Sequence, residues 1–269
     1  MCSGKRAGRW MAVVPAAVLL VLAGCKAGPE VRQGPVVIES VDDPARPALE
    51  AALSRLEADL PTIREVSAEL ERQESSGGRL QPKETIIVLE RTEPRALHLT
   101  WTEGPDKGRH VLWVQDDNDG KVLVKLGGWK GRVSGILALD PDGPVARAGS
   151  RYPVPVIGYH RLLERVVRNY KASVLNRSPA VHDLGSQQLP DRRIHEYEVV
   201  LNCPAERGCD YGRMLLWFDD RGLLVRFAGY GHDDRLIEDY FWHNLRINPG
   251  LADTDFVLEP APPAGNRSQ

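Results

Sequence analysis

Short strand-like segments follow one another along most of this chain, and turns of only a few residues link them. Between Glu65 and Glu71 apolar and charged residues alternate with the period of two that a half-buried strand requires. Turns such as 104–108 and 116–120 are too short for a parallel crossover, so we expect an antiparallel meander. The predicted sheet has about ten strands, at residues 65–71, 85–89, 96–101, 109–114, 122–126, 133–139, 194–201, 214–218, 223–227 and 236–247.

Two stretches change to a helical period. Apolar residues at spacings of four, three and four predict an amphipathic helix that ends near Pro61; these residues are Leu49, Leu53, Leu56 and Leu60. A second helix is predicted over residues 158–170, with an apolar face opposite an arginine-rich one. The fold class is therefore α+β.

Several predicted strands are apolar on both faces, notably Val111–Val114, Met214–Phe218 and Leu223–Val225. An antiparallel strand with one wet face alternates, so these strands need a cover on each side. Two helices cover one face of such a sheet. The other face then requires closure, loops or a ligand, and this unfilled surface indicates a binding function.

The N-terminus reads as a bacterial export signal. Lys5, Arg6 and Arg9 precede about twelve apolar or small residues, fewer than the roughly 20 of a membrane span. The run ends in Leu22-Ala23-Gly24-Cys25, which resembles the lipobox of bacterial lipoproteins. We therefore expect a signal peptide at 1–24 and acylation of Cys25, which anchors the chain in a membrane. Lys26 favours the periplasmic face of the outer membrane; an ordinary secretion signal is the alternative.

The remaining chain divides into three parts. Residues 25–46 are rich in Gly and Pro and predict a lipidated, flexible tether, residues 47–258 form one folded domain, and the Pro-rich residues 259–269 form a disordered tail. Cys203 and Cys209 lie in the domain, and an even pair in an oxidising compartment predicts a disulfide. A metal or redox pair is the alternative, although the two-residue spacing typical of such sites is absent.

Composition and motifs argue against several classes of function. The 35 Lys and Arg residues balance 37 Asp and Glu residues, so the excess of basic charge typical of nucleic-acid binders is missing. The sequence lacks the patterns of serine hydrolases, dinucleotide-binding proteins, P-loop NTPases and zinc proteases. We expect neither an enzyme nor a metal or cofactor site.

Three blocks of sequence resemble a family of exported bacterial proteins known as domain of unknown function 1571. The blocks are 107–121 with Gly127-Gly128, 138–154, and 244–256, and the resemblance spans about residues 60–258. It implies a fold similar to the LolA/LolB-like lipoprotein carriers: a strongly curved antiparallel half-barrel, with helices packed on the concave side over an apolar cavity. It implies no catalytic residue.

These observations predict a non-enzymatic periplasmic lipoprotein that binds a lipid, a lipidated peptide or another amphiphile in a half-barrel cavity. Burial of chain methylenes supplies most of the affinity. The expected wall residues are Leu99, Trp101, Val111, Trp113, Leu215 and Trp217. Plain core packing of the tryptophans is the alternative for these residues. The alternative for the protein is an envelope scaffold without a cavity, whose exposed apolar patch contacts a protein partner that the sequence does not identify.

Overall fold

The computed structural model describes residues 44–258. Their ordered elements are α1 (Arg46–Asp59), β1 (Glu65–Ser76), β2 (Arg79–Leu80), β3 (Glu84–Thr92), β4 (Arg95–Glu103), β5 (His110–Val114), β6 (Val122–Lys125), α2 (Gly128–Ser134), β7 (Ile136–Leu139), α3 (Tyr159–Asn176), β8 (Ala180–Gln188), β9 (Arg193–Val200), β10 (Arg213–Asp219), β11 (Leu224–Tyr230) and β12 (Leu236–Ile247). Cys25 and the predicted signal peptide, most of the tether and the tail lie outside these residues. No helix within 44–258 has the length and apolarity to cross a membrane.

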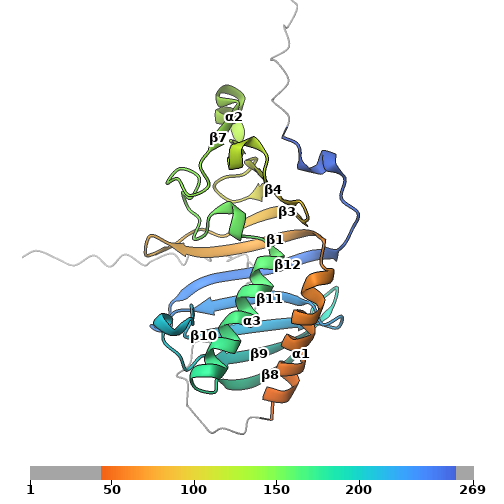
Figure 1. Ribbon diagram of the computed structural model, residues 1–269, viewed down its shortest axis with the longest axis vertical. Helices are drawn as coiled ribbons and strands as arrows, with labels where there is room; N and C mark the ends of the chain where they lie inside the picture. Colours follow the sequence, from red (N-terminus) through yellow and green to blue (C-terminus); the bar gives the residue numbers. More distant parts are fainter. Residues whose placement is uncertain (1–43, 259–269) are drawn as a thin grey trace, which may run out of the picture. The chain divides into compact units, whose positions relative to one another are not determined.

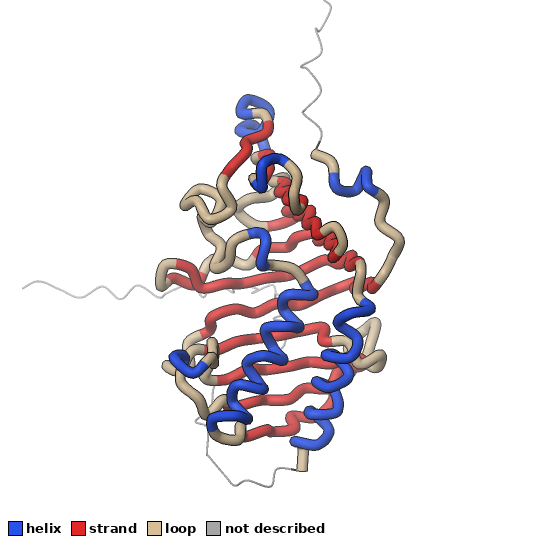
Figure 2. Tube along the Cα trace, viewed as in Figure 1, coloured by secondary structure: helices blue, strands red, loops and turns tan. Residues whose placement is uncertain are grey.

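The strands form one antiparallel sheet in the order β7-β6-β5-β4-β3-β1-β12-β11-β10-β9-β8, and β2 pairs only with β1. The sheet is strongly curved and does not close, because β7 and β8 remain as its two edges (Figures 1 and 2). The predicted fold class is thereby confirmed. The meander prediction holds only within each half, because the first and last long strands pair at the centre, with Leu70 opposite Trp242.

Helices α1 and α3 lie on one face of the sheet, here called the helix-side face (Figure 1). Helix α1 buries Leu49, Leu53 and Leu56 on the stripe that the sequence predicts. Helix α3 buries Leu162, Leu163 and Val166, and it continues to Asn176 rather than ending at Tyr170. Residues 178–179 are Ser-Pro, and a proline disfavours helical geometry at the residue before it. The helix therefore ends shortly before Ser178.

Two regions differ from the local predictions. Residues 128–134 form helix α2, so the strand predicted from Val133 begins only at Ile136. Strand β8 was not predicted, because Asp183, Gly185 and Ser186 interrupt its apolar pattern. It is an edge strand with most residues at least partly exposed, and such strands do not need alternation.

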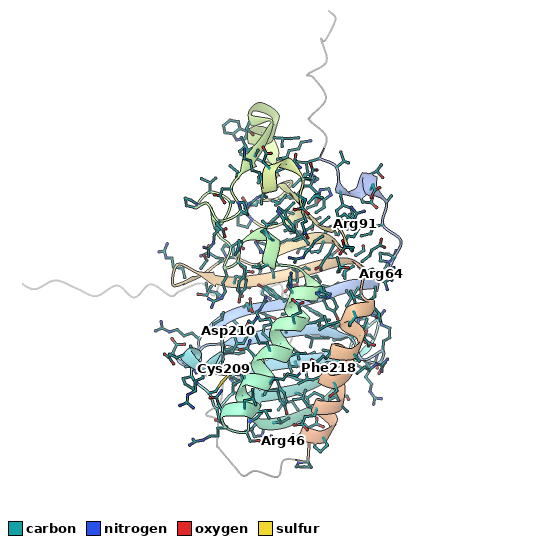
Figure 3. All side chains as sticks on the ribbon, viewed as in Figure 1. Arg46, Arg64, Arg91, Cys209, Asp210 and Phe218 are labelled. Atoms are coloured by element: carbon teal, nitrogen blue, oxygen red, sulfur yellow. A yellow bond between two sulfur atoms is a disulfide. The ribbon has the colours of Figure 1, made fainter. Side chains whose placement is uncertain are left out.

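The second face of the sheet, here called the outer face, is already covered by the chain itself. Over β4 and β5, Phe256 packs with Ala96 and Leu112. Arg91 lies 4.7 Å from the Phe256 ring and holds the same C-terminal stretch (Figure 3). Over β10–β12 the guanidinium of Arg226 stacks 4.6 Å from the Trp217 ring and pairs with Asp239 at 2.9 Å. Long arginine side chains thus cover apolar strands, so the outer face is not the unfilled surface that the sequence indicates.

Candidate functional site

The helix-side face over β3–β5 is covered by an irregular stretch instead of a helix. Residues 140–158, here called the cover segment, connect β7 to α3 and contain only one short 3-10 turn, Val154–Val156. A link of this length without a long regular element exceeds the roughly 12–15 residues at which loops become uncommon, and such loops are often functional. Arg95 of β4 holds its end through the carbonyl oxygens of Pro155 and of Ile157, the latter at 3.3 Å.

A small pocket lies between the end of the cover segment and the sheet. Ile157 and Gly158 form its roof. Its apolar wall consists of Leu70, Ile86, Val88, Leu99 and Trp242, and its polar end consists of Arg72, Glu74 and Tyr240. The free space is about 20 Å³, which holds roughly one water molecule. The pocket therefore combines an apolar wall with a charged, hydroxyl-bearing end.

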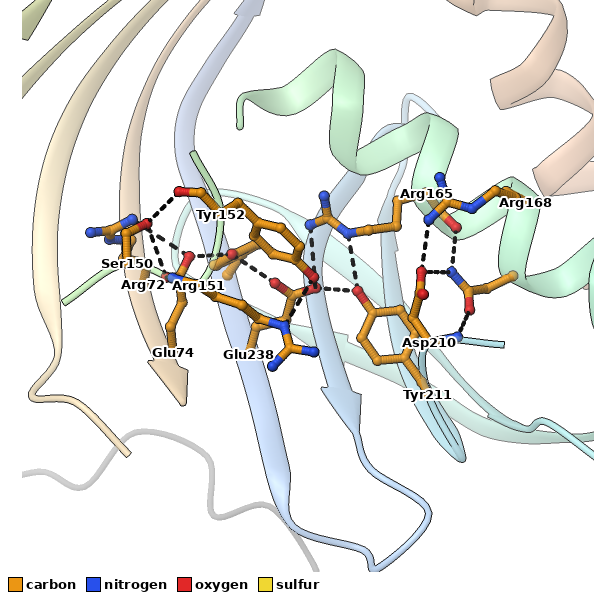
Figure 4. A network of polar contacts seen from close by, with 12 residues as sticks. Arg72, Glu74, Ser150, Arg151, Tyr152, Arg165, Arg168, Asp210, Tyr211 and Glu238 are labelled. Carbon is orange, nitrogen blue, oxygen red and sulfur yellow. Dashed lines mark hydrogen bonds and ion pairs between the residues drawn. The ribbon is translucent and has the colours of Figure 1, made fainter. Parts of the chain in front are cut away.

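Two buried carboxylates lie in this region, Glu74 at the polar end of the pocket and Glu238 behind Tyr240 (Figure 4). Glu74 of β1 is 2% exposed and Glu238 of β12 is fully buried. The hydroxyl of Tyr240 contacts both: it is 2.8 Å from Oε2 of Glu238 and also meets Oε1 of Glu74. Burial and the two carboxylates raise the pKa of Tyr240 well above its usual value, so it stays a protonated donor.

Arginines compensate these charges. Arg165 of α3 donates from Nη2 to Glu238 over 3.2 Å and from Nε to the Tyr211 hydroxyl over 3.0 Å. Burial opposes its charge, but the Glu238 carboxylate and the tyrosines around it together outweigh burial and raise the pKa of Arg165. Arg72 lies 3.5 Å from Glu74 and 3.0 Å from Glu84. We call Glu74, Glu238, Tyr240, Arg72, Arg165 and Tyr211 the carboxylate cluster.

The cover segment is attached to this cluster through its middle. The backbone N–H of Arg151 donates to Oε2 of Glu74 over 2.9 Å, and the Ser150 hydroxyl lies 3.5 Å from the same atom. The Tyr152 hydroxyl lies 3.4 Å from Oε1 of Glu238. The carboxylate cluster therefore fixes the cover segment by polar contacts (Figure 4).

A third buried carboxylate, Glu90 of β3, holds the junction of the cover segment and α3. Its Oε2 accepts the N–H groups of Tyr159 at 2.7 Å and His160 at 3.3 Å, the first free donors of α3. Burial raises the pKa of Glu90 to about 7. Glycine is required at position 158 for two reasons. A Cβ there would lie 2.7 Å from the Glu90 carboxyl, and the backbone φ of Gly158 is +114°.

The predicted wall residues divide between the two faces. Leu99 lines the pocket and therefore lies on the helix-side face. The same face carries three more of the predicted residues, Trp101, Val111 and Trp113, because Val111 pairs with Leu99 and Trp113 pairs with Leu97, two positions along β4. Arg72 lies 5.6 Å from the Trp101 ring. Strand β10 places Leu215 and Trp217 on the outer face, with Ala228 and Arg226 as neighbours. The structure does not bring these two together with the other four.

The sequence reasoning missed the carboxylate cluster, although a signal existed. The inward alternation Val66, Ala68, Leu70 continues to Arg72 and Glu74 along β1. Charged residues at inward positions of a strand indicate a buried polar site rather than the end of the strand.

The predicted disulfide is confirmed. Cys203 and Cys209 are bonded, with Cα atoms 5.9 Å apart, in the loop between β9 and β10 (Figure 3). The loop packs beside α3, where the Asn169 side chain accepts the N–H of Asp210 at 2.6 Å. The disulfide thus fixes the loop that leads to Tyr211 of the carboxylate cluster.

A comparison with protein-family models matches residues 63–263 to the family described as protein of unknown function DUF1571. The chain belongs to this family. The resemblance inferred from the three sequence blocks is thereby confirmed. A comparison with curated protein sequences gives no match for this DUF1571 member.

Several solved structures are similar to this DUF1571 protein at low identity. The lipoprotein LppX of Mycobacterium tuberculosis has 15% identity and a TM-score of 0.43, with 75% of this chain and 98% of that chain covered. MucB in the MucA/MucB complex of Pseudomonas aeruginosa has 13% identity and a TM-score of 0.42, with coverages of 78% and 61%. A LolA superfamily protein of Nitrosomonas europaea has 11% identity and a TM-score of 0.32, with coverages of 78% and 97%.

Proposed function

We propose that this protein is a non-enzymatic lipoprotein of the bacterial envelope, anchored through Cys25, that binds an amphiphile beneath the cover segment. The pocket on the helix-side face carries this proposal, because its apolar wall ends at Arg72, Glu74 and Tyr240. The lipobox at Leu22–Cys25 supports the anchor and the envelope location, with the periplasmic face of the outer membrane favoured by Lys26.

Binding requires the cover segment to move. Ligand sites for small molecules measure roughly 300–1,000 Å³, far more than the present space of about 20 Å³. Only Ala146 and Val154 of the cover segment are buried apolar residues, so few apolar contacts oppose its displacement. Each methylene that enters contributes about 0.8 kcal/mol, whereas the polar end selects a head group that accepts from Arg72 and donates to Glu74.

Lipid extraction and mass spectrometry test this proposal directly. A soluble chain that begins at Lys26 is exported, purified without detergent and extracted with organic solvent. We expect an amphiphile in near-stoichiometric amount with the unaltered chain. Absence of such material, together with failure to bind added phospholipids or fatty acids, would refute the proposed function.

A matched pair of variants locates the site. Leu99 and Leu112 are 4% and 3% exposed and lie on neighbouring strands, but Leu112 packs on the outer face with Phe256. Replacement by tryptophan overpacks both places at a similar cost of roughly 1–3 kcal/mol. We expect Leu99→Trp to lose the amphiphile and Leu112→Trp to retain it. Equal retention by the two variants would place the ligand elsewhere.

An open groove between α1 and α3 favours a second candidate, an envelope scaffold that contacts a protein partner. The groove has a volume of about 360 Å³ and is lined by Leu53, Val167, Val174 and Leu175 among others. Leu175 is 86% exposed and Val174 46%. If this candidate is right, Leu175→Asp will release a specific protein complex from native envelope extracts, whereas Leu99→Trp will leave that complex intact.

A further inference from the structure

The connection between β6 and β7 presents an exposed tryptophan at one edge of the sheet. Trp129 lies in helix α2 and is 73% exposed, whereas Trp101, Trp217 and Trp242 are at most 4% exposed. Figure 1 shows α2 beyond the strands, next to the edge strand β7 and away from α1 and α3. Core packing, which explains the buried tryptophans, does not explain Trp129.

Close backbone contacts fix the position of α2. A Cβ on Gly127 would lie 2.1 Å from the carbonyl oxygen of Lys107, and a Cβ on Gly131 would lie 1.7 Å from that of Leu126. Only glycine permits both approaches. Trp129 is therefore held between two tightly packed positions, and its exposure is a built feature of the turn.

The same stretch concentrates positive charge. Residues 125–135, here called the tip, comprise α2 and its links to β6 and β7. They include Lys125, Lys130 and Arg132 and contain no Asp or Glu. The whole chain, in contrast, has slightly more acidic than basic residues, 37 against 35. An exposed indole in a purely cationic stretch is the combination that anionic lipid surfaces attract, because basic residues bind the surface charge and tryptophan prefers the interface.

We propose that the tip docks on the surface of a bilayer that contains anionic phospholipid, with Trp129 at the level of the head groups. The occupant is a lipid surface because a tryptophan has an apolar body and one polar N–H, which match the two sides of that interface. Each basic residue near such a surface strengthens binding about fivefold. This docking goes beyond the proposed function, since it needs neither the pocket nor the cover segment.

Vesicle sedimentation tests the docking with the unacylated chain that begins at Lys26. The probes are vesicles of mixed phosphatidylglycerol and phosphatidylcholine, and vesicles of phosphatidylcholine alone. Trp129→Ser removes the indole, and the double variant Lys130→Gln, Arg132→Gln removes two charges. Leu184→Ser is the matched control, because Leu184 is also an exposed large apolar residue and lies on β8, at the opposite edge of the sheet.

We expect the unaltered chain to bind the mixed vesicles and to bind phosphatidylcholine vesicles far more weakly. Trp129→Ser should weaken binding about tenfold and abolish the vesicle-induced blue shift of tryptophan emission. The double variant should weaken binding more than about tenfold, and Leu184→Ser should leave binding unchanged. Binding unaffected by Trp129→Ser, or independent of phosphatidylglycerol, would overturn the proposal. So would a failure of the unaltered chain to sediment, which would point to an acidic protein as the occupant. Loss of the co-purifying amphiphile in Leu99→Trp does not bear on this result, so the two proposals fail separately.

Discussion

Removal of the Glu238 carboxylate should destabilise the fold strongly. Glu238 is fully buried and receives contacts from Arg165, Tyr211 and Tyr240. Glu238→Ala leaves the Arg165 guanidinium, whose side chain is 8% exposed, buried without its carboxylate. Breaking a buried ion pair on one side costs about 3–5 kcal/mol. Because domains have a free energy of unfolding of roughly 5–15 kcal/mol, this loss is a large fraction of the total.

This loss of unfolding free energy is measured by urea unfolding of the chain that begins at Lys26, with tryptophan fluorescence as the signal. Asp233→Ala is the control: Asp233 pairs with Arg235 at 3.5 Å, but the two side chains are 63% and 87% exposed. Such a surface pair contributes less than about 1 kcal/mol. Adding Arg165→Met to Glu238→Ala should restore part of the stability, because it removes the unpaired charge. A Glu238→Ala chain no less stable than Asp233→Ala would refute the buried cluster.

Three further predictions concern other groups. Burial raises the pKa of Glu90 from 4.5 to about 7. Between these pH values the folded state keeps a proton on Glu90 that the unfolded state loses, so the free energy of unfolding falls as pH rises from 4.5 through 7. The free energies of unfolding from urea titrations at pH 5 and pH 8 should differ by up to about 3 kcal/mol, with the lower value at pH 8, and Glu90→Gln should remove that difference. Replacing Cys203 and Cys209 together by serine should cost about 2 kcal/mol of unfolding free energy, because the closed loop is short; alkylation and mass measurement verify the bond. Cys25→Ser should move the exported protein from the membrane fraction to the soluble fraction, and an unchanged distribution would exclude the lipid anchor.

Local pattern was sufficient to predict most of the elements. The leucine spacing in 49–60 defines α1, and the first half of β1 follows from strict alternation. These signals survive because each element buries one face against a single layer. The disulfide was predictable for a similar reason, since Cys203 and Cys209 are close in sequence and lie in one loop.

Pairings between distant segments were not predictable from pattern. Strand β1 pairs with β12 across most of the chain, and no local signal distinguishes this neighbour from the hairpin partner β3. The outer-face cover is equally non-local, since Phe256 reaches Ala96 and Leu112. The carboxylate cluster joins Glu74, Arg165 and Glu238 from three separate elements, so only its inward position on β1 was visible in the sequence.

The way the cover segment is held determines what its opening requires. Its middle is attached through Glu74 and Glu238, and its end through Arg95 and Glu90, all by hydrogen bonds or ion pairs. Water can replace such bonds, and each bond to a charged group costs about 1.5–3 kcal/mol net to exchange. A cover held by large apolar side chains would instead expose its core on opening, at about 25 cal/mol per Å². In the proposed function, opening therefore breaks polar bonds rather than an apolar core. An acyl chain then covers the apolar wall, while the carboxylates regain water or bind the head group.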